Sequence, residues 1–598
     1  AGRTGSGQPP RGRSDPGWEP FPTASVIRAA ADELALTFEH GGMRLRASIR
    51  LVGAAAALEF AISPLSWGEG AAGDVVFPGA IIGSGPSQAV VPAFQGLLYR
   101  GKEGPFEEYN PGGGLRMRWW GVIGERSSYL AIVETADDAG LYVIGDERGR
   151  VHGKVRWLAS LGELAYERRV IYHFMPGVRS YVPLAKRFRA YARAHGLFRS
   201  LQDKAADRPA LQRLLGAVFV FLGYQQGDGL DYLAGLRTLK AMGVERAFCF
   251  PFFFCNWAAP FVVQGVGAIA QRHLVDVVQR ELGYLCSPWM WNFEILTRSP
   301  DYTPEMIVRR GDGRLAEHWR IDDDVWQVVN PRRAAELFKG YEAEFMLCDG
   351  FHFDVTTSHG LMEDRAPGRP MTRAEDREAR TDLFRWLTDR GKVVGSEGFW
   401  DWAAPVYDYG TTKLAPHFGP NERYWTIPLL GLVYHDAVLH TWWEVDAYNE
   451  RHPPFPGRGG QLTRQSLQDI LFADPPLVFP IGRKNYWLDR RARRGIIFGQ
   501  YNLDSAEVRR AVRRAVEVAR IQRALAFEEM VSHCFLSPDG AVQETAFASG
   551  TRIAVNLSPH PAETADGQPI EPFAWRIYGN MAASGTRLDA RQGLNDSA

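Results

Sequence analysis

The sequence lacks the features that would place the protein in a membrane or on nucleic acid. It has no run of about 18 apolar residues, so no membrane-spanning helix is predicted. Its 69 Lys and Arg residues balance 69 Asp and Glu residues, so bulk charge gives no reason to expect binding to nucleic acid or to an anionic membrane surface. The N-terminal stretch AGRTGSGQPPRGRSDPG also lacks the apolar segment of a secretion signal.

Cysteine is scarce, and its spacing argues against a zinc site. The five cysteines lack the paired spacing of zinc ligands, and four of them lie in or beside apolar, strand-like runs. Such residues are typical of buried free thiols, which favour a reducing compartment. We therefore expect a cytoplasmic protein, and the sequence leaves its oligomeric state open.

Several motifs of catalysis and cofactor binding are also missing. The chain has no G-x-S-x-G elbow, no Walker phosphate loop and no H-E-x-x-H helix. The acidic run RIDDDVW, residues 320–326, could hold a structural Ca²⁺, but it lacks the spacing of a calcium loop, and a solvated turn is the favoured interpretation. No cofactor and no catalytic metal are predicted.

The pattern of apolar and polar residues changes along the chain. Its 598 residues exceed one compact domain. Gly, Pro, Arg and Ser dominate residues 1–23, which predicts a disordered segment. Residues 24–180 contain many short alternating segments separated by Gly, Pro and Asp, which predicts a β-sandwich. A helical linker is expected over residues 181–207 and a small β domain over residues 526–598.

Between these parts, residues 208–525 alternate strand-like and helix-like segments. The apolar run LLGAVFVFLGY (214–224) precedes the amphipathic DYLAGLRTLKAMGV (231–244), and this pattern recurs in about eight units. That number predicts a (β/α)8 TIM-like barrel. A doubly wound open sheet is the alternative, but no Gly-rich phosphate loop follows the first strand. The predicted fold class is therefore multidomain, α/β plus β.

Two carboxylates end neighbouring predicted strands of this barrel. GFHFDVTTSHG turns polar after Asp354, and KVVGSEGFWDW carries Glu397 near the end of its strand. Active sites of such barrels lie at the C-terminal ends of the strands. Neighbouring strands lie about 4.8 Å apart, and retaining glycosidases use carboxyl groups about 5–5.5 Å apart. Either residue could merely cap a turn, but together they predict a catalytic pair.

The surroundings of the two carboxylates suggest different roles. Thr356, Thr357 and Ser358 follow Asp354, and their hydroxyls are expected to stabilise its ionised form, which suits a nucleophile. Glu397 has apolar neighbours that favour the protonated form, which suits a general acid.

Aromatic and polar residues beside the predicted strand ends are candidates for sugar binding. Indole rings pack against the C–H faces of sugars, although a large core also uses them. Asp408 is expected in the strand VYDYG, and His435 with Asp436 at the end of the strand LVYHD. His359 is expected to be an ordinary loop residue. The expected binding residues are Trp289, Trp291, Asn292, His352, Trp400, Trp402, Asp408, His435 and Asp436.

These motifs also carry a resemblance. With VVPAFQGLLYRG and RWWGVIGERSSYLAIVETADDAGLYV in the N-terminal part, GFHFDVTT and VVGSEGFWDW resemble the glycoside hydrolase 101/129 group, in particular its exo-acting family 129-like branch. The resemblance implies a retaining α-N-acetylgalactosaminidase-type enzyme. It also implies that Asp354 is the nucleophile and Glu397 the acid/base.

The favoured interpretation is a glycoside hydrolase that releases a terminal α-linked sugar, α-GalNAc or an α-galactose-like unit, by double displacement. One alternative is an inverting or transglycosylating enzyme acting on another α-glycan. A second is a carbohydrate-binding protein without catalysis. All three have a carbohydrate as the partner.

Overall fold

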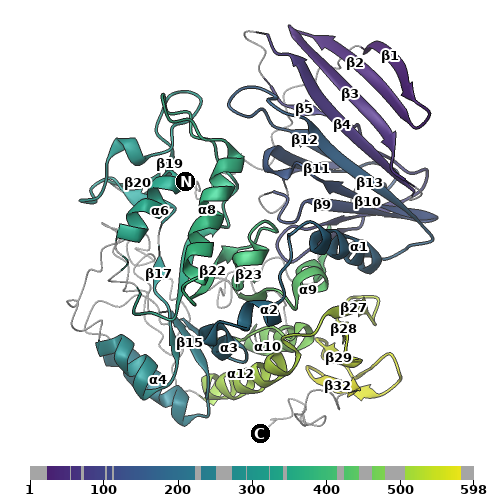
Figure 1. Ribbon diagram of the computed structural model, residues 1–598. Helices are drawn as coiled ribbons and strands as arrows, with labels where there is room; N and C mark the ends of the chain where they lie inside the picture. The colour runs from purple at the N-terminus through teal and green to yellow at the C-terminus, as the bar shows by residue number, and fades with distance from the viewer. Residues whose placement is uncertain are drawn as a thin grey trace.

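The computed structural model describes residues 23–53, 56–68, 73–101, 104–110, 114–221, 230–250, 273–290, 292–321, 323–340, 342, 346–413, 423–442, 461–478 and 506–580. Within these residues the chain forms N-terminal antiparallel sheets, a central part with parallel sheets and helices, and a C-terminal antiparallel sheet. The N-terminal and C-terminal sheets lie on the same side of the central part (Figure 1). Residues 1–22 of the expected disordered segment lie outside the described residues.

Two antiparallel sheets make up the N-terminal region. The larger has the order β1-β2-β3-β4-β13-β10-β9-β6-β7-β24 and the smaller the order β5-β12-β11-β8. The larger sheet consists of β1 (Thr23–Ala30), β2 (Glu33–His40), β3 (Met43–Leu51), β4 (Ala57–Ser66), β13 (Arg168–Pro176), β10 (Ser127–Val133), β9 (Trp119–Gly124), β6 (Ser87–Val91), β7 (Leu97–Tyr99) and β24 (Tyr424–Thr426). The smaller sheet consists of β5 (Val75–Val76), β12 (Val151–Trp157), β11 (Ala139–Gly145) and β8 (Phe106–Tyr109).

Strand β10 is apolar without interruption because both of its faces are buried. Side chains of a strand alternate between its two faces. Tyr129, Ala131 and Val133 pack in the core between the two N-terminal sheets. Leu130 and Ile132 belong instead to the large central core, which also contains residues of the helix α1 (Tyr181–Ala194). The N-terminal region is therefore packed on the central part rather than loosely linked to it.

The central part contains two parallel sheets. One has the order β16-β15-β14-β26 and the other the order β17-β21-β22-β23-β25. Their strands are β14 (Val218–Phe221), β15 (Ala247–Phe250), β16 (Leu285–Cys286), β17 (Trp289–Met290), β21 (Gly350–Thr357), β22 (Val393–Gly398), β23 (Tyr409–Lys413), β25 (Leu439–Trp442) and β26 (Leu477–Val478). Only Ser287 and Pro288 separate β16 from β17, so one extended segment contributes to both sheets.

Helices and one further sheet surround these strands. The sheet β18-β20-β19 is inserted after β17 and is antiparallel, with β18 (Glu294–Leu296), β19 (Glu317–Ile321) and β20 (Asp324–Val328). The helices are α2 (Leu201–Ala205), α3 (Pro209–Leu214), α4 (Leu230–Ala241), α6 (Pro331–Gly340), α8 (Arg373–Thr388), α9 (Leu429–Tyr434), α10 (Gln461–Phe472) and α12 (Ala506–Leu525). Short 3-10 turns occur at Ala136–Asp138, Pro304–Met306 and Ala404–Val406, and a π-helical turn at Val277–Glu281. Phe219 of β14 and Phe248 of β15 pack with the Tyr409 ring of β23 at 5.2 and 5.3 Å, so the two parallel sheets contact each other.

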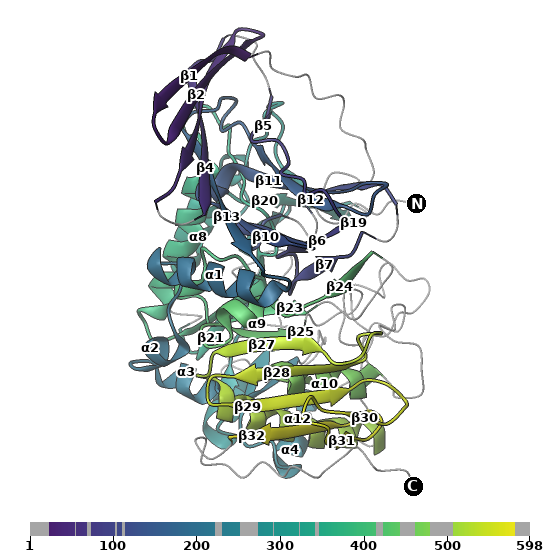
Figure 2. The same cartoon turned by 90° about the vertical axis from the view of Figure 1, so that its right-hand side faces the viewer.

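The C-terminal region is an antiparallel sheet in the order β27-β28-β29-β32, with a separate small pair, β30-β31. Its strands are β27 (Met530–Phe535), β28 (Val542–Phe547), β29 (Thr551–Asn556), β30 (Ala562–Glu563), β31 (Pro569–Ile570) and β32 (Trp575–Gly579). Figure 2 shows α1 and α9 between this sheet and the N-terminal sheets.

Most of the expected elements of the central part are present. The predicted helix at 231–244 is confirmed by α4, and the strands that carry Asp354 and Glu397 by β21 and β22. The prediction of a strand that ends at His435 and Asp436 is wrong, because that segment forms the helix α9. All six residues of α9 are buried, and a continuous apolar run has no periodicity by which strand and helix differ.

Among the described residues, no helix is long and apolar enough to cross a membrane.

Candidate active site

The end of β21 departs from regular strand geometry at Asp354. Strand β21 pairs with β22 in register up to Phe353 opposite Ser396, and pairing resumes only at Thr357 opposite Gly398. Residues 354–356 of β21 therefore face the single residue Glu397 of β22, as in a β-bulge. The bulge places the two expected carboxylates at the same C-terminal edge of neighbouring parallel strands.

Val355, within this bulge, has a strained backbone. Its φ is +60°, in the left-handed region that β-branched residues rarely adopt. Such a conformation costs about 1–3 kcal/mol and persists only where the surrounding structure enforces it, which happens often at functional sites. The strain lies directly beside Asp354.

Both carboxylates lie at the boundary between core and solvent. Asp354 is 8% exposed and Glu397 is 9% exposed, whereas Phe353 and Ser396, one residue earlier on each strand, are fully buried. The carboxylates therefore lie where the buried strand interior ends, the position from which a side chain can act on a bound molecule.

The hydroxyls after Asp354 do not have the partners expected from the sequence. Thr356 Oγ1 donates to Asn292 Oδ1 at 2.7 Å, and Thr357 Oγ1 donates to the Glu397 carbonyl at 2.6 Å. Ser358 Oγ donates to Glu397 Oε2 at 3.3 Å. The expectation that all three hydroxyls serve the Asp354 carboxylate is therefore wrong, and one of them contacts the carboxyl group of Glu397 instead.

Tyr407 holds the backbone on both sides of Glu397. Its hydroxyl donates to the carbonyls of Gly398 at 2.7 Å and Ser396 at 2.8 Å, and it lies 3.1 Å from Thr357 Oγ1. Burial raises the pKa of Tyr407, so the hydroxyl keeps the proton that these contacts require. The hydrogen bonds of Tyr407 therefore hold the C-terminal end of β22 in place.

Arg116 is a site residue that sequence reasoning missed. It comes from the N-terminal region and donates from Nη1 to the Thr357 carbonyl at 2.9 Å and from Nη2 to the Ser358 carbonyl at 2.7 Å. Its guanidinium also lies 5.0 Å from the centroid of the Trp400 ring. Burial lowers the pKa of Arg116 to about 10, which leaves it charged at neutral pH. The only signal in the sequence is a basic residue within the apolar segment LRMRWWGVIG.

His352 and Trp289 are buried side chains on the neighbouring strands β21 and β17, and His352 precedes Asp354 by two residues. His352 shares the strand face of Asp354, and its ring lies 3.9 Å from the Trp289 ring. Its Nδ1 is 3.0 Å from the Tyr409 hydroxyl, and its buried Nε2 has no hydrogen-bond partner within the described part of the chain. Burial lowers the pKa of His352 to about 3, so the imidazole is neutral.

The two tryptophans after Glu397 are also buried. Trp400 is 9% exposed and Trp402 is 6% exposed, and neither indole N–H has a hydrogen-bond partner among the residues that the structure describes. A Cβ added at Gly114 would lie 3.1 Å from Trp400, so the N-terminal region packs directly on this ring. Trp291 lies outside the described residues.

Three expected binding residues have structural partners instead. Asp408 precedes β23, at the strand end opposite to the candidate site, and both of its oxygens accept hydrogen bonds from Arg208, at 2.8 and 2.7 Å. Asp436 accepts two from Arg189 at 2.7 Å. His435 contacts the Glu528 carbonyl at 2.7 Å through Nδ1. The expectation that these residues bind sugar is therefore wrong.

The insertion after β17 adds a polar cluster that sequence reasoning did not anticipate. Glu294, which is 1% exposed, accepts a hydrogen bond from Trp319 Nε1 at 2.7 Å and contacts His318. The His359 ring lies 5.7 Å from the His318 ring. Burial lowers the pKa of His359 to about 4. This loop histidine is therefore a half-buried neutral group beside the candidate site.

Across the described residues, no group of three or more His, Cys, Asp and Glu side chains is arranged to hold a metal ion. In the acidic run of residues 320–326, Asp324 pairs with Arg298 at 2.7 Å, and Asp322 lies outside the described residues.

Neither a family model nor a curated protein matches this sequence. Among solved structures, the chain is similar to NagBb, an α-N-acetylgalactosaminidase from Bifidobacterium bifidum in complex with GalNAc. The TM-score is 0.75 and the identity 20%, over 91% of this chain and 92% of that one. It is also similar to a GH31 family sulfoquinovosidase from E. rectale, with a TM-score of 0.52, 12% identity and coverage of 85% and 75%. A GH36 α-galactosidase, AgaB from Geobacillus stearothermophilus, gives a TM-score of 0.52, 9% identity and coverage of 92% and 79%.

These comparisons establish the fold. The chain is a multidomain protein of mixed α/β fold with several sheets, and almost its whole length superposes on a similar share of NagBb.

Proposed function

We propose that this protein is a retaining exo-α-glycosidase that hydrolyses a terminal α-linked sugar by double displacement. The observation that carries the proposal is the position of Asp354 and Glu397 on neighbouring parallel strands, at one bulge, where the buried interior ends. The fold shared with an α-N-acetylgalactosaminidase supports the same activity class.

The proposed scaffold is a (β/α)8 barrel. In chain order, the pairings run from β14 through β15, the continuous segment β16–β17, β21, β22 and β23 to β25, and β26 pairs back onto β14. Between β25 and β26, Thr441 Oγ1 donates to the Pro475 carbonyl at 3.1 Å, which would bring the last two strands together. The barrel would occupy residues 208–525, with a β-sandwich at 24–180, a helical linker at 181–207 and a β domain at 526–598.

In the first step, the Asp354 carboxylate attacks the anomeric carbon while Glu397 gives its proton to the leaving oxygen. The C–O bond to the leaving group breaks, and an ester between Asp354 and the sugar forms. In the second step, Glu397 takes a proton from water, the resulting hydroxide attacks the anomeric carbon, and Asp354 leaves as a carboxylate. Two inversions give net retention.

The surroundings of Glu397 suit a group that gains and loses a proton in every cycle. A serine hydroxyl can donate to a carboxylate and can also accept from a carboxylic acid. Ser358 Oγ, 3.3 Å from Glu397 Oε2, can therefore contact both protonation states without moving. Asp354, in contrast, is held on a bulge whose conformation is strained, which limits its movement during attack.

The proposed sugar site uses the aromatic and polar groups around the two carboxylates. The buried indole N–H groups of Trp400 and Trp402 and the His352 Nε2 are polar atoms that a sugar hydroxyl can satisfy. Asn292 accepts a hydrogen bond from Thr356 Oγ1, so it would position the bulge rather than bind the sugar. The proposed sugars are α-GalNAc and α-galactose-like units, which NagBb and AgaB suggest by their names.

A screen with aryl α- and β-glycosides tests the proposal. The expected result is release of the aryl group from α-GalNAc or α-galactose substrates, with the α-anomer as the first product in the NMR spectrum. Asp354→Asn should remove activity and leave the melting temperature within a few degrees of the wild type. A β-anomer as first product would identify an inverting enzyme, and sugar binding without turnover would identify a binding protein.

A further inference from the structure

Arg116 reaches the candidate site from the N-terminal region, just before β9. Its backbone carbonyl accepts a hydrogen bond from Asp401 N at 2.9 Å. Two residues later, Arg118 donates to Asp401 Oδ2 from its backbone N at 2.9 Å and from Nε at 3.0 Å. The segment 116–118 is therefore fixed to the loop that follows Glu397.

The guanidinium of Arg116 binds the turn that follows Asp354. Its two Nη atoms donate to the consecutive carbonyls of Thr357 and Ser358. The planar fork of a guanidinium holds two acceptors at a fixed separation, whereas a lysine offers a single point of charge. Arg116 therefore sets the orientation of this turn, and not only its distance from the N-terminal region.

The same turn carries the hydroxyl that contacts Glu397. Besides its contact with Glu397 Oε2, Ser358 Oγ lies 3.2 Å from the Val355 carbonyl. That carbonyl also accepts from the backbone N atoms of Ser358 and His359, at 3.0 Å each. The turn is thus held on one side by the strained residue Val355 and on the other by Arg116.

We propose that Arg116 is a positioning residue for Glu397, which holds the 357–358 turn so that the Ser358 hydroxyl stays against the Glu397 carboxyl group. The inference rests on the proposed function in assigning Glu397 the acid/base role. It makes the N-terminal region part of the catalytic apparatus, because Arg116 holds the Thr357 and Ser358 carbonyls themselves. Arg380 of α8, in the central part, donates instead to the neighbouring carbonyls of Thr356 at 2.7 Å and His359 at 3.3 Å. Loss of Arg116 would therefore release the turn and move this hydroxyl away from the Glu397 carboxyl group.

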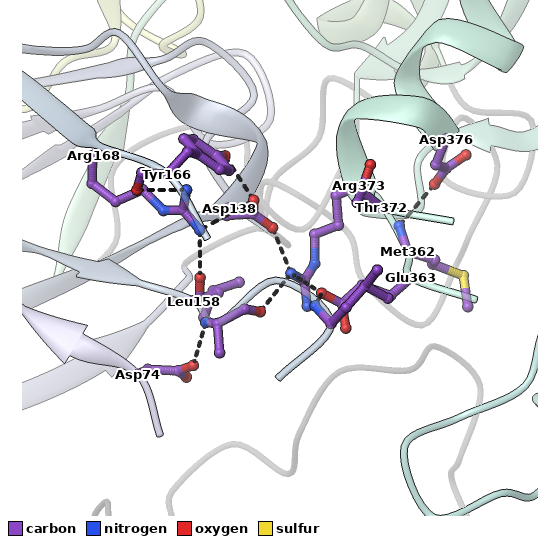
Figure 3. A network of polar contacts seen from close by, with 12 residues as sticks. Asp74, Asp138, Leu158, Tyr166, Arg168, Met362, Glu363, Thr372, Arg373 and Asp376 are labelled. Carbon is purple, nitrogen blue, oxygen red and sulfur yellow. Dashed lines mark hydrogen bonds and ion pairs between the residues drawn. The ribbon is translucent and has the colours of Figure 1, made fainter. Parts of the chain in front are cut away.

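Arg373 provides a matched control, because it joins the same two regions elsewhere. At the start of α8, its Nη1 donates to Asp138 Oδ1 at 2.6 Å, the Ala159 carbonyl at 3.1 Å and Glu363 Oε1 at 3.0 Å. Figure 3 shows this side chain between the N-terminal sheets and the loop before α8. Arg373 has the same residue type and joins the same regions, but its hydrogen bonds go to other residues than Thr357 and Ser358.

The experiment compares the full-length wild type with Arg116→Met, Arg116→Lys and Arg373→Met. Two aryl glycosides of the same sugar are used, one with an activated dinitrophenolate leaving group and one with a poor leaving group that needs protonation. Arg116→Met should lower kcat/KM about tenfold or more for the poor leaving group and far less for the activated one. Arg116→Lys should show a smaller change in the same direction, and Arg373→Met should show none.

Hydrogen exchange measured by mass spectrometry tests, without any substrate, whether Arg116 holds the 357–358 turn in place. Peptides covering residues 354–360 should exchange faster in Arg116→Met than in the wild type, and not in Arg373→Met. Unchanged exchange there, or equal losses of kcat/KM for both leaving groups, would overturn the inference. A wild type that cleaves no glycoside would refute the proposed function alone, because the exchange result would still decide the positioning role.

Discussion

The hydroxyl of Tyr407 donates a hydrogen bond to the carbonyl of Gly398 at 2.7 Å. With its contact to the Ser396 carbonyl, it spans the backbone on both sides of Glu397. Gly398 has a φ of +71°, and a Cβ there would lie 2.7 Å from the Thr357 carbonyl, so β22 can approach β21 this closely only with glycine at this position. The Glu397 side chain thus projects from a backbone that is fixed on both sides.

Tyr407→Phe should weaken this support without touching the sugar site directly. It leaves buried carbonyl groups without a donor, which should lower the free energy of unfolding by about 1–3 kcal/mol. We expect kcat to fall while KM stays nearly constant, as measured by steady-state kinetics and chemical denaturation. Tyr142→Phe removes a hydroxyl that accepts from Arg156 at 3.0 Å in the N-terminal sheets, so it should affect stability alone. Equal kinetics for both variants would contradict the prediction.

Glu397→Ala should show the behaviour of an acid/base variant. The rate with a poor leaving group should fall by about 10²–10⁴-fold, whereas a dinitrophenyl glycoside should still form the glycosyl-enzyme. Azide, which needs no general base, should then restore turnover and yield the α-glycosyl azide. Asp354→Ala should instead give the β-glycosyl azide, because azide attacks the substrate directly. Identical azide products from the two variants would contradict the assignment of roles.

The strands that carry Asp354 and Glu397 were predictable because their information is local. Each is a short apolar run that turns polar at its end, and helix α8 accounts for the gap between them. Arg116 was not predictable, since its contact with the Thr357 carbonyl joins residues 241 positions apart, and a basic residue in an apolar segment does not identify its partner.

The same local pattern failed at Asp408 and Asp436. Both follow apolar residues as Asp354 does, but their partners Arg208 and Arg189 are 200 and 247 positions away in the chain. A carboxylate near an apolar run therefore has two outcomes, a site residue or one half of a buried ion pair. Which one applies depends on long-range packing, which the sequence pattern does not contain.

Asp436→Asn should accordingly affect stability and not substrate binding. Removing one partner of a buried ion pair costs about 3–5 kcal/mol, since the remaining charge stays buried. We expect a loss of that order in chemical denaturation, with KM unchanged. Asp146→Asn, which breaks a more exposed pair with Arg150, should cost much less stability. A KM that rises in Asp436→Asn with stability unchanged would restore the original expectation of sugar binding.

His533 should make the stability of the interface between α1 and the C-terminal sheet depend on pH. Its Nδ1 lies 2.6 Å from the Tyr181 hydroxyl and its Nε2 lies 3.1 Å from Gln543 Oε1. Burial lowers the pKa of His533 to about 4, from the ordinary value of about 6.5. Between these two values the unfolded chain binds a proton that the folded chain does not. This residue therefore contributes a loss of stability of about 1.4 kcal/mol per pH unit as the pH falls from 6.5 to 4.

The comparison of wild type with His533→Gln isolates this contribution. Other groups act in the opposite direction, since burial raises the pKa of Asp474 to about 7 and of Asp469 to about 6. The difference in unfolding free energy between the two proteins should be constant above pH 7. It should then shift against the wild type by about 2 kcal/mol between pH 6.5 and pH 5. His195→Gln changes a histidine at an exposed position and serves as the control. A difference between wild type and His533→Gln that stays constant down to pH 5 would show that folding does not lower the pKa of His533 and would contradict the prediction.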